Sequence, residues 1–221
     1  MKKLWMVVGF CLSLAVFSNA QGIEAGDNMF SMFAGVGGGL QDSGLKWQGE
    51  TVDWGAAGAT IGLSYMVFPS EYFGVGLEIN DGIFGDEEHD VHTGGNHYEM
   101  ENAMNVFNAM ASFRFNFNPQ SRVRFYIPFG GGLSSSTGVI KQTINGWEKT
   151  DRANYNSLGW FAGAGLEVAI GSEGRWALGA EGRYNAFQYD TDKLMQKVGT
   201  TGVGKKDYSY VSVAFKASYR F

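Results

Sequence analysis

Apolar and polar residues alternate with a period of two along most of the chain after residue 28. In the last segment, Val211, Val213, Phe215, Ala217, Tyr219 and Phe221 alternate with Ser212, Ala214, Lys216, Ser218 and Arg220. Successive side chains of a β-strand point to opposite faces, so this period predicts strands with one apolar and one polar face. Seven more segments share the pattern: 29–40, 58–68, 73–80, 107–117, 123–134, 157–170 and 175–187. We therefore predict an all-β chain of eight antiparallel strands.

The connections between these segments alternate strictly between long and short. The short ones are 68–71, 118–121 and 171–174, and they carry the proline, glycine and serine of tight turns. The long, polar ones are 41–56, 81–101, 140–155 and 190–206. Short periplasmic turns and longer external loops are typical of an up-and-down transmembrane β-barrel with both termini in the periplasm. Pro128 falls inside one predicted strand, where a missing amide donor predicts a bulge or a strand end.

Glycine indicates which face of the strands points into the barrel. The polar face carries Gly35, Gly37, Gly74, Gly76, Gly159, Gly163 and Gly165. Small residues inside a narrow barrel leave room for larger polar neighbours, whereas on a solvated face they would only weaken the strands. The polar face is therefore predicted to line the lumen, with a charge network of Glu78, Arg114, Arg124, Glu167, Glu181, Arg183 and Lys216. Phe113, Phe115, Phe117, Trp160 and Trp176 on the other face suit lipid.

The N-terminus has the features of a secretory signal peptide. Lys2 and Lys3 precede an apolar stretch from Leu4 to Phe17, and small residues at 18–20 offer a cleavage site. We expect cleavage after Ala20, which leaves one domain, the outer-membrane β-barrel of residues 21–221. No later apolar run reaches the roughly 18 residues that a transmembrane helix needs.

The composition of residues 21–221 excludes several classes of function. Cys11 lies in the signal peptide and is the only cysteine, which excludes disulfides and thiolate metal sites. Loss of Lys2 and Lys3 leaves 15 basic and 22 acidic residues, a net charge of −7. An acidic chain of this kind argues against nucleic acid as a partner.

The C-terminal segment resembles a known signal. Tyr219 and the terminal Phe221, with alternating apolar positions back to Val211, resemble the end signal that the barrel-assembly machinery recognises. With the strand count and the loop pattern, the whole of residues 21–221 resembles the small eight-stranded outer-membrane barrels of OmpA/OmpX type. This resemblance implies a location in the Gram-negative outer membrane, with membrane lipid and the assembly machinery as partners. We expect no periplasmic peptidoglycan-binding domain after Phe221.

All three histidines, His89, His92 and His97, fall in the second long connection. Six acidic residues surround them: Asp86, Glu87, Glu88, Asp90, Glu99 and Glu101. Imidazole and carboxylate groups in this density are candidate ligands for zinc or another divalent ion. The alternative is an ordinary polar external loop, and our default expectation is no metal and no cofactor. Residues 199–206 approach a phosphate-binding P-loop, but Lys206 stands where the motif requires Ser or Thr, so we interpret them as a loop.

Three functions follow from these patterns. The first is a structural or surface-interaction role through the external loops, with a possible extracellular ligand and no catalysis. The second is a lipid-modifying enzyme of the lipid A deacylase or acyltransferase type, although no histidine lies on a predicted strand beside a serine. The third is a narrow pore, although side chains fill the interior of a barrel this small. Exposed loop aromatics (Trp47, Trp54, Trp147 and Tyr155) fit either a binding surface or a girdle at the lipid headgroups.

Overall fold

A computed structural model describes residues 22–40, 45–47, 50–52, 57–93, 96–144, 147–190, 192 and 204–221. The predicted signal peptide lies outside these residues. Within the described ranges, no helix is long and apolar enough to cross a membrane.

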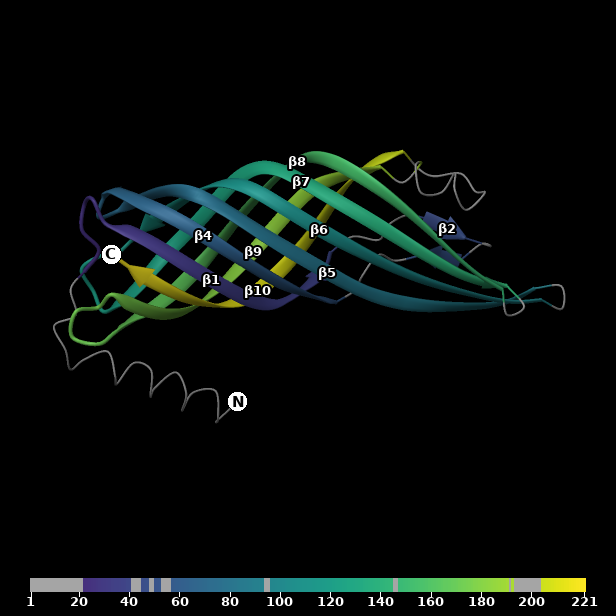
Figure 1. Cartoon of the computed structure of the whole chain (residues 1–221), viewed down its shortest axis with the longest axis horizontal. Coiled ribbons are helices and arrows are strands. Elements are labelled where there is room, and N and C mark those ends of the chain that lie inside the picture. The colour runs from purple at the N-terminus through teal and green to yellow at the C-terminus, as the bar shows by residue number, and fades with distance from the viewer. Residues whose placement is uncertain are drawn as a thin grey trace.

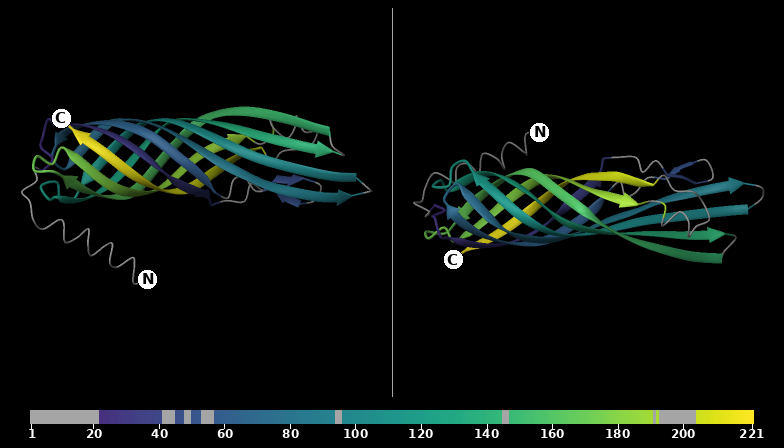
Figure 2. Two further views of the ribbon diagram at one scale, coloured as in Figure 1. Left: turned by 60° about the horizontal axis from the view of Figure 1, so that its bottom comes forward. Right: turned by 90° about the horizontal axis from the view of Figure 1, so that it is seen from above.

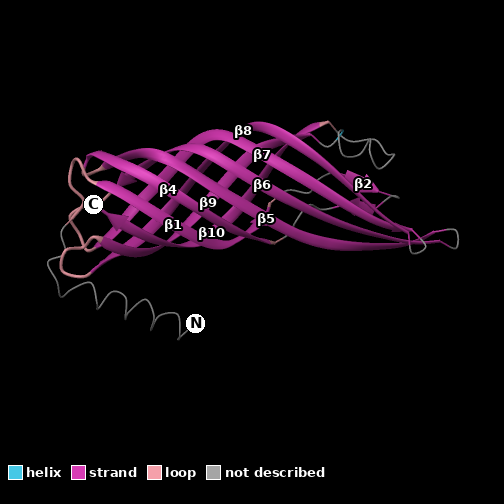
Figure 3. Ribbon diagram, viewed as in Figure 1, coloured by secondary structure: helices cyan, strands magenta, loops and turns pink. Residues whose placement is uncertain are grey.

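Eight long strands close into one antiparallel barrel, as the alternating pattern predicts (Figures 1 and 3). They are β1 (Asn28–Gly39), β4 (Gly58–Ser70), β5 (Phe73–Thr93), β6 (Asn96–Asn116), β7 (Val123–Ile144), β8 (Trp147–Ile170), β9 (Trp176–Asp190) and β10 (Lys205–Arg220). Each strand pairs with its neighbour in the chain, and β1 pairs with β10 from Met29↔Arg220 to Gly39↔Tyr210. A separate two-stranded sheet joins β2 (Leu45–Trp47) to β3 (Glu50–Val52).

The tight turns at 70–73, 116–123 and 170–176 all lie at one end of the barrel, together with the C-terminus (Figure 3). We call this the turn end. Gly171 and Gly174 have positive φ angles of 78° and 59°, which L side chains rarely adopt, so glycine is required in the last of these turns.

At the opposite end, two hairpins run well beyond the rest of the barrel (Figure 2). The predicted loops at 81–101 and 140–155 are wrong, because strands β5 and β6 continue to Thr93 and Asn96 and strands β7 and β8 continue to Ile144 and Trp147. We call residues 85–93, 96–105, 135–144 and 147–158 of these four strands the sheet extension. The β6–β7 ladder runs to Tyr98↔Ile144 and joins the two hairpins into one sheet.

The apolar residues change faces where the sheet extension begins. Inside the ring they point outward, as at Phe107 and Leu133, which are 45% and 66% exposed. Beyond it they point inward, as at Met104 and Ile140, which are 1% and 0% exposed. Apart from Val139, the outward positions beyond Leu133 and Leu158 are polar, so the continuous apolar outer belt ends at these two residues.

Proline interrupts pairing without changing the register. The β7–β8 ladder has Tyr126↔Gly165 and then Phe129↔Ala162, with the same offset on both sides of Pro128. The predicted bulge at Pro128 is therefore wrong, although its ladder with β8 is broken there. The register shifts instead between Val67 and Ser70 and between Phe84 and Glu87.

Candidate functional site

The seven charged residues predicted to line the lumen all lie inside the barrel. They come from six strands and are at most 7% exposed: Glu78, Arg114, Arg124, Glu167, Glu181, Arg183 and Lys216. Alternation places them there, because each is flanked in the chain by residues that point outward. We call these seven residues the charged layer.

One half of the charged layer is centred on Glu167 of β8. Arg114 of β6 binds this carboxylate with two parallel hydrogen bonds, Nη1 to Oε2 at 2.9 Å and Nη2 to Oε1 at 2.7 Å. Arg114 Nε also donates to Asn116 Oδ1 at 2.6 Å. A bidentate, charge-assisted pair of this kind is strong and fixes the orientation of both groups.

Arg124 of β7 is the less well bound partner of the same carboxylate. Its Nε lies 2.9 Å from Glu167 Oε1 as an ion pair. Within the described residues, however, neither Nε nor Nη1 of Arg124 makes a hydrogen bond. Arg124 is therefore a buried cation whose charge is partly compensated, while two of its three guanidinium nitrogens make no hydrogen bond in the described structure.

The other half of the charged layer crosses the barrel. Arg183 of β9 reaches Glu78 of β5, with Nη2 2.8 Å from Oε2 and a second contact through Nη1. Strands β9 and β5 stand four places apart in the ring of eight, so this pair spans the interior. Arg183 Nε also donates to Glu181, and Lys216 Nζ lies 3.4 Å from the other oxygen of Glu181.

Two aromatic rings enclose the Arg183 guanidinium. Its Cζ lies 4.7 Å from the ring centroid of Phe33 and 4.5 Å from that of Phe161. Cation–π contacts strengthen when the cation is removed from water, as it is here. These rings and the two carboxylates leave Arg183 almost no freedom to change rotamer.

Tyr126 connects the two halves, and the sequence analysis did not identify it. Its hydroxyl donates to Glu181 Oε2 at 2.8 Å, and the Arg114 guanidinium stacks 3.7 Å above its ring centroid. The ring occupies the space above Gly165, its partner in the β7–β8 ladder, where an added Cβ would collide with Tyr126 Cζ. The signal was present in the sequence, since a lumenal glycine predicts a large neighbour on the next strand.

Apolar clusters cover the charged layer at both ends of the barrel. Toward the turn end lie Ile23, Met29, Met66 and Phe68. Toward the sheet extension lie Phe84, Met104, Val106, Ile140, Ala153, Phe187, Tyr189, Tyr208 and Tyr210. Between the charged layer and this second cluster, Asn80 donates to Glu78, Asn108 donates to Asn80, and Ser134 donates to Asn108. The interior is thus filled by side chains along its length.

This arrangement can hold strands together but offers little free reactivity. Four cations face three carboxylates, and removal of one partner would leave a buried charge without compensation. Ser134 donates to Asn108, whereas the hydroxyl of Ser64, the ladder partner of Glu78, makes no hydrogen bond within the described residues. The layer therefore acts as an internal cross-brace between β5, β6, β7, β8, β9 and β10.

The other candidate residues lie elsewhere. His89 and His92 belong to β5 and His97 to β6, with His92↔His97 paired in the ladder; their side chains lie outside the described residues. Among the side chains that are described, no group of three potential metal ligands occurs. Trp47 belongs to β2, with its side chain outside the described residues, and Trp54 lies outside them altogether.

The remaining aromatic candidates lie at opposite ends of the molecule. Trp147 begins β8 and is 82% exposed, whereas Tyr155 packs against the apolar cluster beneath the sheet extension. The ring of Tyr219 lies 4.8 Å from that of Trp176 in a tilted arrangement and stacks on the terminal Phe221 at 6.1 Å, at the outer rim of the turn end. The two predicted assembly-signal residues therefore belong to one aromatic group.

Comparison with known proteins places this barrel in a family. No curated protein matches the chain. Three solved structures are similar in fold: Ail, the attachment invasion locus protein of Yersinia pestis (15% identity, 89% of this chain and 99% of that one, TM-score 0.45), OprG of Pseudomonas aeruginosa (16%, 91% and 99%, 0.46) and a major outer membrane protein of Thermus thermophilus (14%, 88% and 99%, 0.46). The family model described as the outer membrane protein beta-barrel domain matches residues 9–221. The chain therefore belongs to the outer membrane protein β-barrel family.

Proposed function

We propose that this outer-membrane barrel acts at the cell surface, where the sheet extension binds partners along the outer edge of strand β8. Membership of the family locates the chain in the outer membrane. Short turns face the periplasm in barrels of this kind, so the turn end and the C-terminus are assigned to the periplasm and the sheet extension to the exterior. The outward positions beyond Leu133 and Leu158, which are polar apart from Val139, support this assignment because they lie past the apolar belt.

The observation that carries the proposal is the part of β8 that continues beyond its ladder with β9. The β7–β8 ladder runs to Ile144↔Trp147, whereas the β8–β9 ladder begins only at Gly159↔Phe187. Among the described residues, no strand pairs with the outer edge of Trp147–Leu158. At about 3.4 Å per residue, these twelve residues extend roughly 40 Å beyond the ladder between β8 and β9.

A strand edge of this length, beyond the last paired strand of the ring, is a template for an added strand. Main-chain hydrogen bonds along it would supply affinity, and the side chains would supply selectivity. Glu148, Lys149 and Arg152 are exposed along this edge, and Lys149 Nζ pairs with Asp151 Oδ2 at 2.8 Å. Charged residues on an edge strand discourage self-association, so we expect an extended segment of another polypeptide as the partner.

The filled interior supports a barrel that does not conduct. The Arg183–Glu78 pair crosses the lumen, and apolar clusters lie above and below it. We therefore expect no single-channel conductance in planar bilayers. The proposal also assigns no catalysis, so lipid A from cells that produce the chain is expected to keep its acyl groups in mass spectra.

A shortened hairpin tests the proposal. Thr137 and Asn154 are ladder partners, so residues 138–153 can be replaced by an Asn-Gly turn without a change of register. The probe is an immobilised, permanently unfolded protein (reduced, carboxymethylated lactalbumin), which offers extended backbone. Cells with the full chain are expected to bind it, and cells with the shortened hairpin are expected to lose this binding.

The matched control keeps the edge and changes charge at the other end of the barrel, by Glu173→Gln in the last tight turn. Both variants must still migrate faster on gels before boiling than after, which shows that the barrel is folded. Equal binding by the shortened hairpin and the full chain would overturn the proposal.

A further inference from the structure

The outer wall formed by β4, β1, β10 and β9 is organised in rows that the strand registers define. The row nearest the turn end is aromatic: Tyr65, Phe30, Tyr219 and Trp176. The next row is Leu63, Met32, Ala217 and Leu178. The third is Ile61, Ala34, Phe215 and Ala180. The aromatic row is the girdle expected at a membrane interface, so the next two rows face the hydrocarbon.

Small side chains leave a depression in the second and third rows. Ala34 and Ala217 lie diagonally across the β1–β10 seam, surrounded by the longer side chains of Met32, Phe215 and Leu178. A groove of about 400 Å³ lies here, and its lining also includes Ile61 and Leu63. We call it the wall groove. The outward-facing side chains that line it are apolar, and Lys216, which also contributes to the lining, points into the lumen.

A polar recess lies beyond the aromatic row, at the end of the same wall. It has a volume of about 350 Å³ and is lined by Glu173, Arg175, Trp176 and Tyr219 with the residues of the last turn. Arg175 Nε lies 2.9 Å from Glu173 Oε2, and both side chains are more than half exposed. The recess therefore offers one positive and one negative group side by side.

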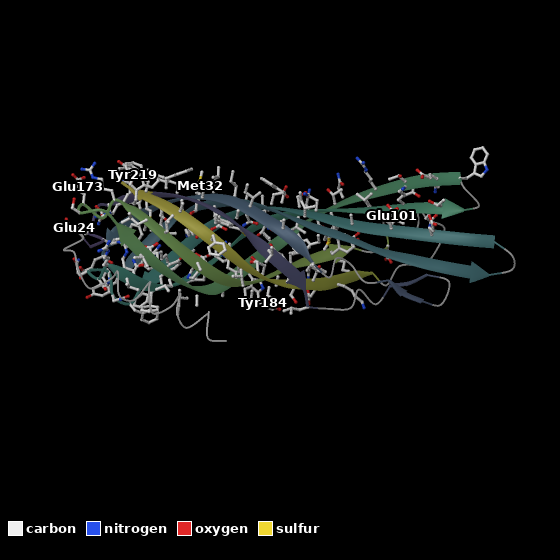
Figure 4. All side chains as sticks on the ribbon, turned by 90° about the horizontal axis from the view of Figure 1, so that it is seen from below. Glu24, Met32, Glu101, Glu173, Tyr184 and Tyr219 are labelled. Carbon is white, nitrogen blue, oxygen red and sulfur yellow. The ribbon has the colours of Figure 1, made fainter. Side chains whose placement is uncertain are left out.

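The wall groove and the recess are aligned. Arg175 of the recess precedes Leu178 of the groove by three residues along the chain, about 10 Å when extended. Figure 4 shows the same alignment: Glu173, Tyr219 and Met32 lie one after another along one side of the barrel, from the turn end toward its middle. The apolar wall groove, which ends at a pair of opposite charges, is complementary to a lipid with apolar acyl chains and a zwitterionic headgroup.

We propose that the wall groove and the recess bind one phospholipid with an ammonium headgroup, from the leaflet next to the turn end. An acyl chain lies between Ala34 and Ala217, the phosphate accepts hydrogen bonds from Arg175, and the ammonium donates to Glu173. The lipid covers the seam where the first and last strands close the barrel. This inference is independent of the partner proposed for the sheet extension.

Native mass spectrometry tests the site. The folded chain in lipid-free detergent is titrated with palmitoyl-oleoyl phosphatidylethanolamine and, separately, with the phosphatidylglycerol of the same chains. One phosphatidylethanolamine is expected to bind about tenfold more tightly than phosphatidylglycerol, the ratio that about 1.4 kcal/mol produces. It should also raise the temperature at which the heat-modifiable band unfolds, because a ligand of the native state stabilises it.

Two variants separate the parts of the site. Ala34→Phe with Ala217→Phe fills the groove, and Arg175→Gln removes the phosphate donor; each is expected to abolish the preference for phosphatidylethanolamine. The matched control is Ala109→Phe with Ala111→Phe, two exposed alanines on β6 at the opposite side of the ring, which should leave the preference intact. If the groove variant does not fold, Arg175→Gln decides. Equal binding of both lipids by the unmodified chain, an unaffected groove variant, or a dimer mass without lipid would overturn the proposal.

Discussion

The barrel ring and the sheet extension are made of the same strands but hold their charges in opposite ways. In the ring, Arg183 and Glu78 pair at 5% and 1% side-chain exposure, beneath apolar residues. In the sheet extension, Lys141 and Glu101 pair at 34% and 35% exposure. A buried pair is costly to break because water cannot hydrate the charge that remains. In an exposed pair, water hydrates the remaining charge and the cost is small. The ring is therefore built to be rigid, and the sheet extension can change its contacts without endangering the fold.

The largest test of this difference is Arg183→Met. It leaves both Glu78 and Glu181 in the lumen without their shared guanidinium, so we expect a loss of about 3–5 kcal/mol in the free energy of unfolding. The measurement is a urea titration in detergent micelles, followed by tryptophan fluorescence. In the sheet extension, Lys149→Met removes the exposed partner of Asp151 and should cost less than about 1 kcal/mol. Equal losses for the two variants would show that burial does not distinguish the regions.

A second test concerns packing in the ring alone. Gly165→Val places a side chain where the Tyr126 ring lies, and overpacking of this kind costs about 1–3 kcal/mol. Gly182, on the outer face of the neighbouring strand β9, has nothing within 4 Å of an added Cβ. Gly182→Val should therefore leave the unfolding free energy unchanged or raise it slightly, because valine favours strands. The same urea titration compares the two variants. An unchanged free energy of unfolding in Gly165→Val would mean that the Tyr126 ring can adopt another position.

The two regions also differ in how well their sequence predicts them. In the ring, most apolar residues lie on the outer face, so the period of two predicts the strands, the lumenal face and the closed barrel, all of which the structure confirms. At the start of the sheet extension the apolar residues change to the inner face, at Met104 on β6 and Ile140 on β7. This inversion breaks the pattern and makes strand residues resemble a polar loop.

The charged layer shows a second limit of the sequence. Alternation is a property of a single strand. It places Glu78, Arg183 and the other five residues of the charged layer in the lumen, but it does not predict which of them pair. The pairing of Glu78 with Arg183 depends on their positions in the ring and on the stagger between strands. Tyr126 has the lumenal parity of Arg124 on the same strand, but alternation alone does not show that its partner Gly165 leaves room for the ring inside.

A third test compares Arg124 with Arg114, the two arginines of the charged layer that contact Glu167. Its Nε and Nη1 lack hydrogen bonds in the described structure, and Glu167 keeps the bidentate Arg114 without it. A buried cation bound this loosely stabilises little, so Arg124→Met is expected to change the unfolding free energy by less than about 1 kcal/mol, or to raise it. Arg114→Met should cost about 2–3 kcal/mol, since it removes hydrogen bonds between charged groups. Equal costs for the two variants would show that Arg124 has a partner of its own.

The smallest effect is expected at Lys141 in the sheet extension. The hydrogen bond from Lys141 to Glu101 raises the pKa of this lysine above its ordinary 10.5, with the charges of Glu101 and Glu148 acting in the same direction. A raised lysine pKa means that the protonated form is favoured by folding, so this contribution is complete below pH 10.5 and is lost as the pH rises through the folded-state value. NMR titration of the Lys141 Cε signal in micelles measures the shift, and Glu101→Gln should lower the pKa toward its ordinary value. An unchanged pKa in that variant would mean that the exposed pair is fully screened by water, and the electrostatic contrast between the two regions would then be greater still.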